Sequence, residues 1–245
     1  MSGHSKWSSI KHKKGALDAK RGKLFTKLSR DITLVAKNGS DPLSNSSLRL
    51  AIQKAKDANM PAANIERAIK KASGPDSGTV LQEITYEGYG PGGSAIIIDA
   101  VTDNKNRTAS EVRLAFNRNG GNLSEPGVVA WQFKMNGLLH INNFSGDIDN
   151  LQLLAIDSGA IDIVINDNEI EIITEPSSIE SVRSILNNNN IEVNSMEVTR
   201  IPENLLELNK DDTLKTIKLL EIIDDLDDVS RVQTNIAISD ELLAI

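Results

Sequence analysis

The stretch from Gly3 to Arg30, GHSKWSSIKHKKGALDAKRGKLFTKLSR, is the segment around which the chain is organised, and it holds nine lysines and arginines against the single acid Asp18. Its first part, residues 2–15, has too few apolar side chains to fold alone and is predicted to be an arm. From residue 16 the apolar side chains recur at helical spacing. They predict one helix whose inner stripe is formed by Leu17, Leu24, Leu28, Ile32 and Val35.

A second stripe on the same predicted helix is cationic and consists of Lys20, Lys23, Lys27 and Arg30. At about 100° per residue it lies roughly a third of a turn from the apolar stripe, so one helix can face a core and solvent together. A solvated helix face is the plainer interpretation, because lysine is the usual surface residue. Binding of a polyanion is favoured, because the charge continues into an arm that has no role in folding.

The charge of the whole chain is divided unevenly along its 245 residues. Residues 1–75 carry 16 Lys and Arg against 5 Asp and Glu, net +11, whereas residues 76–245 carry 11 against 29, net −18. The chain's net charge of −7 conceals this division. A dense positive block in an otherwise acidic chain indicates a polyanion as the partner.

Composition excludes several classes of site and segment. The chain has no cysteine, which excludes disulfides, thiolate metal sites and a cysteine nucleophile, and which suits a reducing compartment. No apolar run approaches the roughly 20 residues that a membrane span needs, and residues 1–17 lack the apolar core of a secretory signal. The same residues have lysines and no amphipathic apolar face, unlike a transit peptide. We therefore expect a cytoplasmic protein with no membrane partner.

Three short helices are predicted within residues 16–75. Asn45 and Ser46 are suited to cap the second helix, Pro61 to open the third, and Gly74 with Pro75 to end it. A helix-turn-helix reader of DNA has this organisation, but three-helix packing is also the commonest way to bury short amphipathic helices. Both interpretations remain open from the sequence.

The remainder is predicted to form two α/β domains. Strands are expected at 82–86, 95–101 and 128–133, with a helix at 108–119, and a further helix and strand at 212–226 and 232–238. Between them, residues 135–200 read as βαββαβ, the order of a ferredoxin-like unit. The predicted class is α+β: a basic arm and helical domain at 1–78, an α/β domain from 79–134 with 203–245, and a ferredoxin-like α/β domain inserted at 135–202.

Two loops have features of phosphate sites. The glycine loop at 88–93 is followed by a strand, so no helix N-terminus is available to a phosphate, and a shaped connection between strands is the better interpretation. Tyr86 and Tyr89 flank it and are suited either to stack on a base or to pack on the sheet. At 102–108, two cations and several capping residues indicate either a phosphate at a helix start or an ordinary capped helix.

No pattern of a catalytic or metal site is present. His4, His12 and His140 have no metal-binding spacing, and nothing sets a general base against a nucleophile. The acid run Asp224, Asp225, Asp227 and Asp228 is predicted to be a solvated face or turn. We expect no catalytic residue, no metal, no cofactor and no small-molecule substrate.

Several blocks of the sequence resemble the YebC/PmpR family over essentially the whole chain. They are GHSKW at 3–7, IKH at 10–12, DAKR at 18–21, FTK at 25–27, NMP at 59–61, IERAI at 65–69, YEGYGPG at 86–92, TDN at 102–104 and NRT at 106–108. Two positions depart from the family: Ser46 stands where a proline is usual, and Lys105 where an arginine is frequent.

The resemblance implies three domains and a protein of gene expression. Family members are commonly described as DNA-binding transcriptional regulators, and a mitochondrial relative as a translational activator. Members are also implicated in helping ribosomes through proline runs. We therefore expect a non-enzymatic nucleic-acid-binding regulator, with a ribosome-associated translation factor that binds ribosomal RNA as the alternative. A protein-interaction scaffold is the third class, and it would keep its binding when the arm lysines are removed.

The predicted nucleic-acid contacts lie in the arm and on the first helix, with a secondary contact near the glycine loop. The primary set is Lys6, Trp7, Lys11, His12, Lys13, Lys14, Lys20, Arg21, Lys23, Lys27 and Arg30. The secondary set is Tyr86, Tyr89, Lys105 and Arg107.

Overall fold

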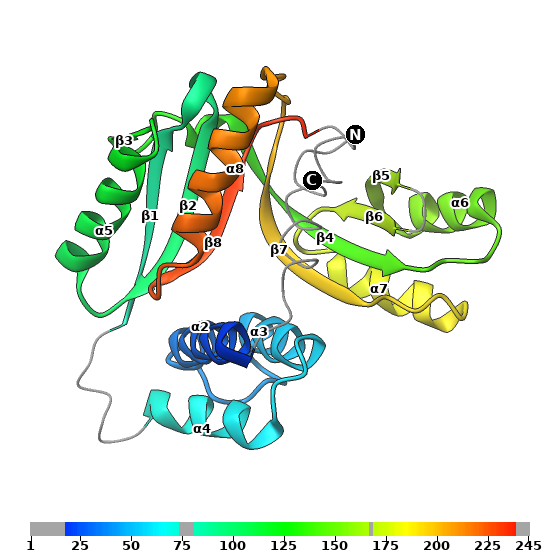
Figure 1. The fold of residues 1–245 in the computed structure, drawn as a ribbon. Helices are drawn as coiled ribbons and strands as arrows, with labels where there is room; N and C mark the ends of the chain where they lie inside the picture. Colours follow the sequence, from blue (N-terminus) through cyan, green and yellow to red (C-terminus); the bar gives the residue numbers. More distant parts are fainter. Residues whose placement is uncertain (1–17, 74–80, 167–168, 239–245) are drawn as a thin grey trace. The chain divides into compact units, whose positions relative to one another are not determined.

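The computed structural model describes residues 18–73, 81–166 and 169–238 (Figure 1). The chain divides into two compact units, of which one is Lys134–Ile201 and the other contains the segments on either side of it. Each unit is described by itself below. In the described ranges, none of the helices combines the length and the apolar character needed to cross a lipid bilayer.

The first described elements form a three-helix bundle of α2 (Asp18–Ala36), α3 (Ser46–Asp57) and α4 (Ala62–Ser73). Asn45 is the N-cap of α3, because its side chain accepts a hydrogen bond from the Leu48 N–H at 3.0 Å. Asn59, with φ of 58°, reverses the chain before Pro61, and α4 begins directly after that proline. These local signals were legible in the sequence.

The bundle core is formed by one face of each helix. Its buried side chains are Leu28, Ile32, Ala36, Leu48, Ala55, Met60, Ile65 and Ala68. One predicted member of the apolar stripe is wrong: Leu24 is 39% exposed. The reason is that Phe25, one position further round the helix, packs on the core in its place.

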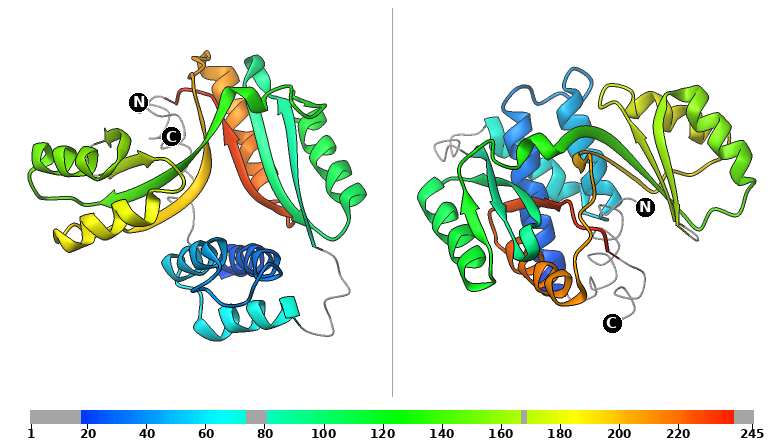
Figure 2. Two further views of the ribbon diagram at one scale, coloured as in Figure 1. Left: turned by 180° about the vertical axis from the view of Figure 1, so that it is seen from behind. Right: turned by 90° about the horizontal axis from the view of Figure 1, so that it is seen from above.

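The first sheet has the strand order β3-β1-β2-β8, from β1 (Gln82–Tyr89), β2 (Ala95–Thr102), β3 (Asn122–Ser124) and β8 (Val229–Thr234). All its pairings are antiparallel. Helices α5 (Lys105–Arg118) and α8 (Lys210–Asp224) cover one face of it (Figures 1 and 2). Strand β2 is buried along its whole length. On the face covered by the helices, Ile96 and Ile98 pack in one hydrophobic core with Phe116 and Leu220.

The glycine loop is a connection between β1 and β2, as predicted. It contains the short helix η2 (Pro91–Gly93), in which Gly92 has φ of 65°, a conformation that side chains with a Cβ rarely adopt. Gly88 is required by packing, because a Cβ there would lie 2.5 Å from the Asn122 carbonyl oxygen and 2.8 Å from the Phe116 ring. The glycines therefore have structural explanations.

The strand predicted at 128–133 is wrong. Residues 125–129 form a turn, η3 (Ala130–Gln132) follows, and β4 begins only at Phe133. The cause is Glu87, a buried residue of β1 whose carboxylate accepts hydrogen bonds from the N–H groups of Gly127, Val129 and Ala130 at 2.7–2.8 Å. Because a side chain binds these donors, the segment forms no sheet ladder.

Three predicted boundaries also shift. The helix expected at 108–119 begins at Lys105, because Asn104 caps it by accepting from the Arg107 N–H. The helix expected at 212–226 is Lys210–Asp224, capped by Asn209. The last strand is Val229–Thr234, and beyond it Ile236 makes only an isolated bridge with Leu206.

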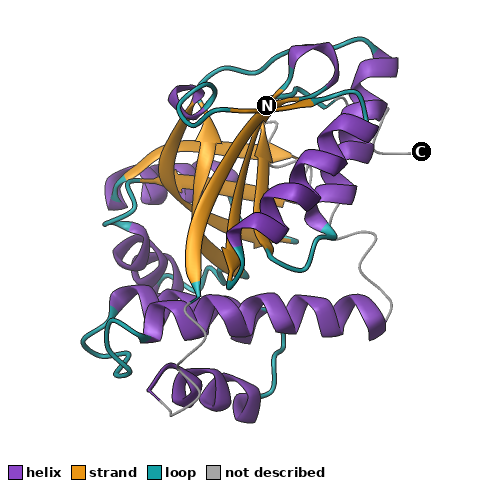
Figure 3. Ribbon diagram, turned by 90° about the vertical axis from the view of Figure 1, so that its left-hand side faces the viewer, coloured by secondary structure: helices purple, strands orange, loops and turns teal. Residues whose placement is uncertain are grey.

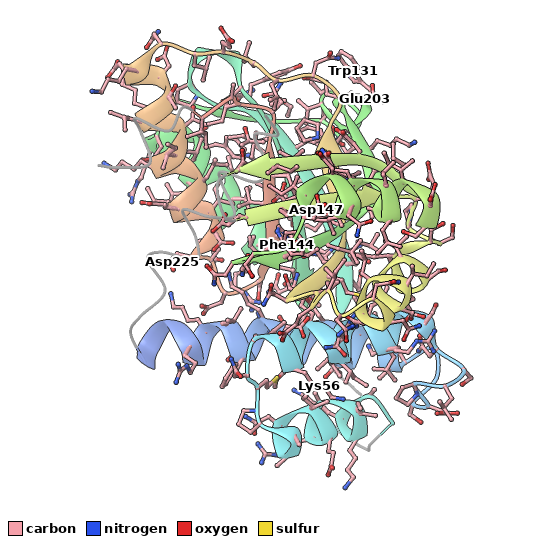
Figure 4. The ribbon with its side chains drawn as sticks, turned by 90° about the vertical axis from the view of Figure 1, so that its right-hand side faces the viewer. Lys56, Trp131, Phe144, Asp147, Glu203 and Asp225 are labelled. Carbon is pink, nitrogen blue, oxygen red and sulfur yellow. The ribbon has the colours of Figure 1, made fainter. Side chains whose placement is uncertain are left out.

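The second unit contains β4 (Phe133–Asn142), α6 (Ile148–Ser158), β5 (Ala160–Asn166), β6 (Glu169–Thr174), α7 (Ile179–Asn188) and β7 (Ser195–Pro202). Its sheet order is β5-β6-β4-β7, the order of a ferredoxin-like fold, so this prediction is confirmed. Asp147, labelled beside Phe144 in Figure 4, caps α6 by accepting from the Asp149 and Asn150 N–H groups. The α+β class is likewise confirmed.

The chain segments that flank this unit meet at a backbone hydrogen bond. The Glu203 N–H donates to the Gln132 carbonyl oxygen at 2.9 Å, and Glu203 and Trp131 lie close together in Figure 4. The chain therefore leaves and re-enters the larger unit at neighbouring points.

We predict that Glu87→Ala lowers the free energy of unfolding by about 3 kcal/mol, because the buried N–H of Val129 and the part-buried N–H groups of Gly127 and Ala130 lose a charged acceptor. Urea denaturation followed by circular dichroism measures the change. Glu83→Ala, at an exposed position of the same strand, is the matched control and should stay within about 0.5 kcal/mol of the wild type. Equal stabilities for the two variants would contradict the role assigned to Glu87.

Candidate nucleic-acid interface

The predicted primary contacts fall into two groups. The arm residues Lys6, Trp7, Lys11, His12, Lys13 and Lys14 lie outside the described residues. Lys20 is on the first turn of α2, where only the backbone is described. Arg21 and Lys23 are exposed, whereas Lys27 and Arg30 are half-buried.

The cationic stripe of α2 meets the C-terminal end of α8. Lys23 Nζ donates to the Asp225 carbonyl oxygen at 3.3 Å, and Lys27 Nζ donates to that of Asp224. Arg30 Nη1 donates to the Asp227 carbonyl oxygen at 2.6 Å. The last carbonyl groups of a helix lack intrahelical partners and form the negative end of its dipole, so cations stabilise them. Lys27 and Arg30 are thus held at the end of α8, whereas Lys23 gives it one hydrogen bond and stays exposed.

Asp228, directly after this helix end, is the centre of a buried polar cluster. It is only 3% exposed, and its Oδ1 accepts from Arg30 Nη1 at 2.7 Å. Its Oδ2 accepts from Arg107 Nη2 at 2.6 Å, from Thr108 Oγ1 at 2.7 Å and from Thr102 Oγ1 at 2.9 Å. One carboxylate therefore joins α2, the end of β2 and the start of α5.

The surroundings of Asp228 and Arg107 favour the charged forms of both side chains. Burial raises the pKa of Asp228, but the hydrogen bonds from Arg107, Thr108 and Thr102 and the charge of Arg30 outweigh it, so this pKa is lowered overall. The hydrogen bond to Asp228 is the main reason that the pKa of Arg107 is raised. Burial, and then the charge of Asp228, raise the pKa of Tyr86.

The acid run ends in a turn after α8, which is one of the two predicted alternatives, but Asp228 is not solvated. Asp225 and Asp227 are exposed, as expected, but Asp228 is among the most buried charged residues of the described chain. No local signal distinguishes it within the run, because its partners lie about 120 and 198 residues away in sequence. Sequence analysis missed this residue for that reason.

The segment at 102–108 is an ordinary capped helix start. Asn104 caps α5, and Arg107 is held by Asp228 and, at 2.9 Å, by Asp103. Of the other secondary residues, Lys105 is exposed, while Tyr86 Oη donates to the Lys105 carbonyl oxygen and Tyr89 Oη to that of Val128. Both tyrosine rings pack on the sheet domain.

Metal chemistry has little support in the part of the chain that is described. Within it, no three His, Cys, Asp or Glu side chains gather in a way that could hold an ion. His140 lies beside Glu171, with Nδ1 3.3 Å from the carboxylate. His4 and His12 are outside the described ranges.

We predict that Asp228→Asn lowers the free energy of unfolding by about 2–4 kcal/mol at pH 7, because two arginines lose their buried counter-charge. Asp225→Asn is the control, because the exposed Asp225 contributes its main-chain carbonyl to Lys23. Thermal or urea unfolding measures both.

The same comparison has a predicted pH dependence. A carboxylate whose pKa is lower when folded stabilises the fold above its unfolded pKa of about 3.9, and that stabilisation is lost as pH falls through the folded pKa. The difference in the free energy of unfolding between the wild type and Asp228→Asn should be constant above about pH 5 and should become smaller below about pH 4. A difference that stays constant down to pH 2–3 would contradict this assignment.

Comparison with known proteins identifies the family of the chain. A family model described as the TACO1/YebC second and third domain matches residues 81–236, and one described as the TACO1/YebC protein N-terminal domain matches residues 5–75. A "Probable transcriptional regulatory protein" of Natranaerobius thermophilus is 50% identical over 247 residues, covering 99% of each chain. One of the same name from Herpetosiphon aurantiacus is 48% identical over 244 residues, covering 99% of this chain and 97% of that protein.

A solved structure agrees with these matches. It is the conserved hypothetical protein Aq1575 of Aquifex aeolicus, with a TM-score of 0.85 and 39% identity, covering 92% of this chain and 94% of that one. Taken with the three-helix bundle and the two sheets described above, these matches show that the chain belongs to the TACO1/YebC family.

Proposed function

We propose that this protein is a non-enzymatic regulator of gene expression that binds nucleic acid through its basic N-terminal region. The observation that carries the proposal is the division of charge, net +11 over residues 1–75 against −18 over the remainder. Phosphate contacts supply most of the affinity of such proteins for nucleic acid. The name "probable transcriptional regulatory protein" carried by relatives about 48–50% identical supports a regulatory role that is not catalytic.

In this proposal the arm supplies the first contacts. Lys6, Lys11, Lys13 and Lys14 neutralise phosphates, and Trp7 stacks on a base or enters a groove. His12 adds a donor in the same segment. The arm residues have no acidic neighbour closer in sequence than Asp18, so no nearby carboxylate competes for their charge.

The basic residues of α2 extend this surface, but they differ in how far intramolecular hydrogen bonds already hold them. Lys20 and Arg21 continue the charge from the arm. Lys23 is exposed and gives one hydrogen bond to Asp225, which leaves further protons of its ammonium group for a phosphate. Lys27 and Arg30 are more deeply held at the end of α8, so their contribution to binding is mainly long-range electrostatic attraction.

The acidic domains have a separate part in this proposal. Their net charge of −18 repels phosphates, which limits binding at random sites and confines contact to the basic region. Of the predicted secondary contacts, we propose only Lys105 as a nucleic-acid contact. The other three side chains, Tyr86, Tyr89 and Arg107, have intramolecular partners.

A role on ribosomal RNA in translation is the second candidate. It is favoured because two long polar side chains of α3 are engaged within the bundle: Arg49 donates to the Pro42 carbonyl oxygen and Gln53 donates to the Asp57 carboxylate. A helix that reads DNA sequence needs such side chains directed at base edges. Recognition by phosphates and shape suits structured RNA equally well.

We predict that changing Lys6, Lys11, Lys13 and Lys14 together to Gln weakens nucleic-acid binding and its salt dependence. Four lost phosphate contacts should make the slope of log affinity against log salt shallower by about 3–4. Titrations of labelled DNA and RNA between about 50 and 200 mM salt measure the slope. A variant with the exposed Lys56, Lys210 and Lys218 changed to Gln is the control.

Crosslinking of the protein in cells, followed by sequencing of the bound nucleic acid, separates the two candidates. Promoter fragments support transcription, and ribosomal RNA supports translation. Unchanged retention of the arm variant on DNA, RNA and ribosomes would reject nucleic-acid binding by the arm and favour a protein-interaction scaffold.

A further inference from the structure

A cleft of about 530 Å³ lies along the junction of α2 and α4. Figure 3 shows α2 as the long helix of the bundle, with α4 packed beside it in Figure 1. Leu81 and Asp103, from the adjoining sheet domain of the same unit, also line the cleft. Its volume lies within the range of sites that hold small organic molecules, roughly 300–1,000 Å³.

The cleft follows from the residue sizes on two helix faces. Ser29 and Thr33 of α2 face Ala68 of α4, and the Thr33 hydroxyl donates to the Ala68 carbonyl oxygen at 3.0 Å. These small residues bring the helices together and leave space above them. Longer side chains at the next helical positions form the walls.

The walls are cationic. Arg30 and Lys37 come from α2, and Arg67 and Lys71 from α4, against Asp103 as the one acid of the lining. Arg30 is held by Asp228, and Asp103 by Arg107. Lys37, Arg67 and Lys71 are exposed and have no ion pair with any residue whose side chain is described.

The like charges of Lys37, Arg67 and Lys71 around one cleft repel one another to the extent that solvent does not screen them. A bound anion would remove the repulsion. The Ser29 hydroxyl and the Asn64 amide lie among the cations as further hydrogen-bonding groups, and the ring of Phe25 lines the same cleft. Cations, neutral donors and an aromatic ring together are the composition of a site for a nucleotide unit.

We propose that this cleft binds the phosphates of single-stranded nucleic acid, with one base against Phe25. The inference rests on the proposed nucleic-acid function and assigns it a second site, distinct from the arm. A hollow between two helices accepts a flexible strand, whose phosphates can turn inward, whereas a duplex presents its phosphates on a stiff convex surface. A free nucleotide shares the same chemistry and is distinguished by the experiment.

The test uses the full chain with Lys37, Arg67 and Lys71 changed together to Gln. All three are exposed, so the fold should persist, and a melting curve checks this. The probe is a fluorescent single strand of about 12 nucleotides, titrated at several salt concentrations. We expect at least about a tenfold loss of affinity and a salt slope shallower by about 2, because single strands contribute about 0.7 per phosphate contact.

The matched control removes the same number of charges away from the cleft: Lys56, Lys210 and Lys218 changed to Gln, at exposed positions on α3 and α8. It should bind within about threefold of the wild type, because screened charges at a distance contribute little. Phe25→Leu keeps an apolar side chain at this position but removes the ring, and it should weaken binding without altering the salt slope.

The outcomes separate the inference from the proposed function. If the wild type binds the single strand and the cleft variant matches the wild type or the control, the cleft is rejected and the arm proposal stands. Equal binding of a duplex, or full displacement by a free nucleoside triphosphate with no gain from strand length, would also overturn the assignment. If the wild type binds no nucleic acid in any form, the proposed function itself fails.

Discussion

The structure depends on one buried carboxylate. Asp228 receives Arg30 from α2, Thr102 from the end of β2, and Thr108 with Arg107 from the start of α5, all at 2.6–2.9 Å. A buried ion pair contributes little net stability, but removing one partner leaves the other charge without compensation. Its consequence here is that one side chain ties α2, the end of β2 and the start of α5 together.

The same region explains why an acidic chain can carry so basic a first helix. The main-chain carbonyl oxygens at the C-terminal end of α8 and just after it accept hydrogen bonds from Lys23, Lys27 and Arg30. Part of the positive charge of α2 is therefore stabilised within the molecule. The basic residues therefore separate into two classes. Those beside α8 hold the fold, whereas those that line the cleft between α2 and α4, such as Lys37 and Lys71, have no carboxylate partner in the described chain.

Local patterns predicted most of the elements, and long-range contacts account for the errors. Periodicity and capping residues located the helices, and the strand–helix alternation gave the ferredoxin-like order of β4 to β7. The segment 128–133 looks like a strand, yet Glu87, some 40 residues earlier, binds its N–H groups. Asp228 resembles its exposed neighbours in the acid run. The cleft at Lys37 and Lys71 depends on how two helices pack, which no stretch of sequence states.

The hydrogen bond between the Glu203 N–H and the Gln132 carbonyl oxygen has a consequence for the entropic cost of folding. The Lys134–Ile201 unit begins and ends on β4 and β7, which are neighbours in its own sheet. Once that sheet has formed, its two ends are already close. An unstructured loop of this length would cost about 4 kcal/mol to close. The folded inner unit therefore holds Gln132 and Glu203 of the larger unit together at a lower entropic cost than an unstructured loop of the same length would.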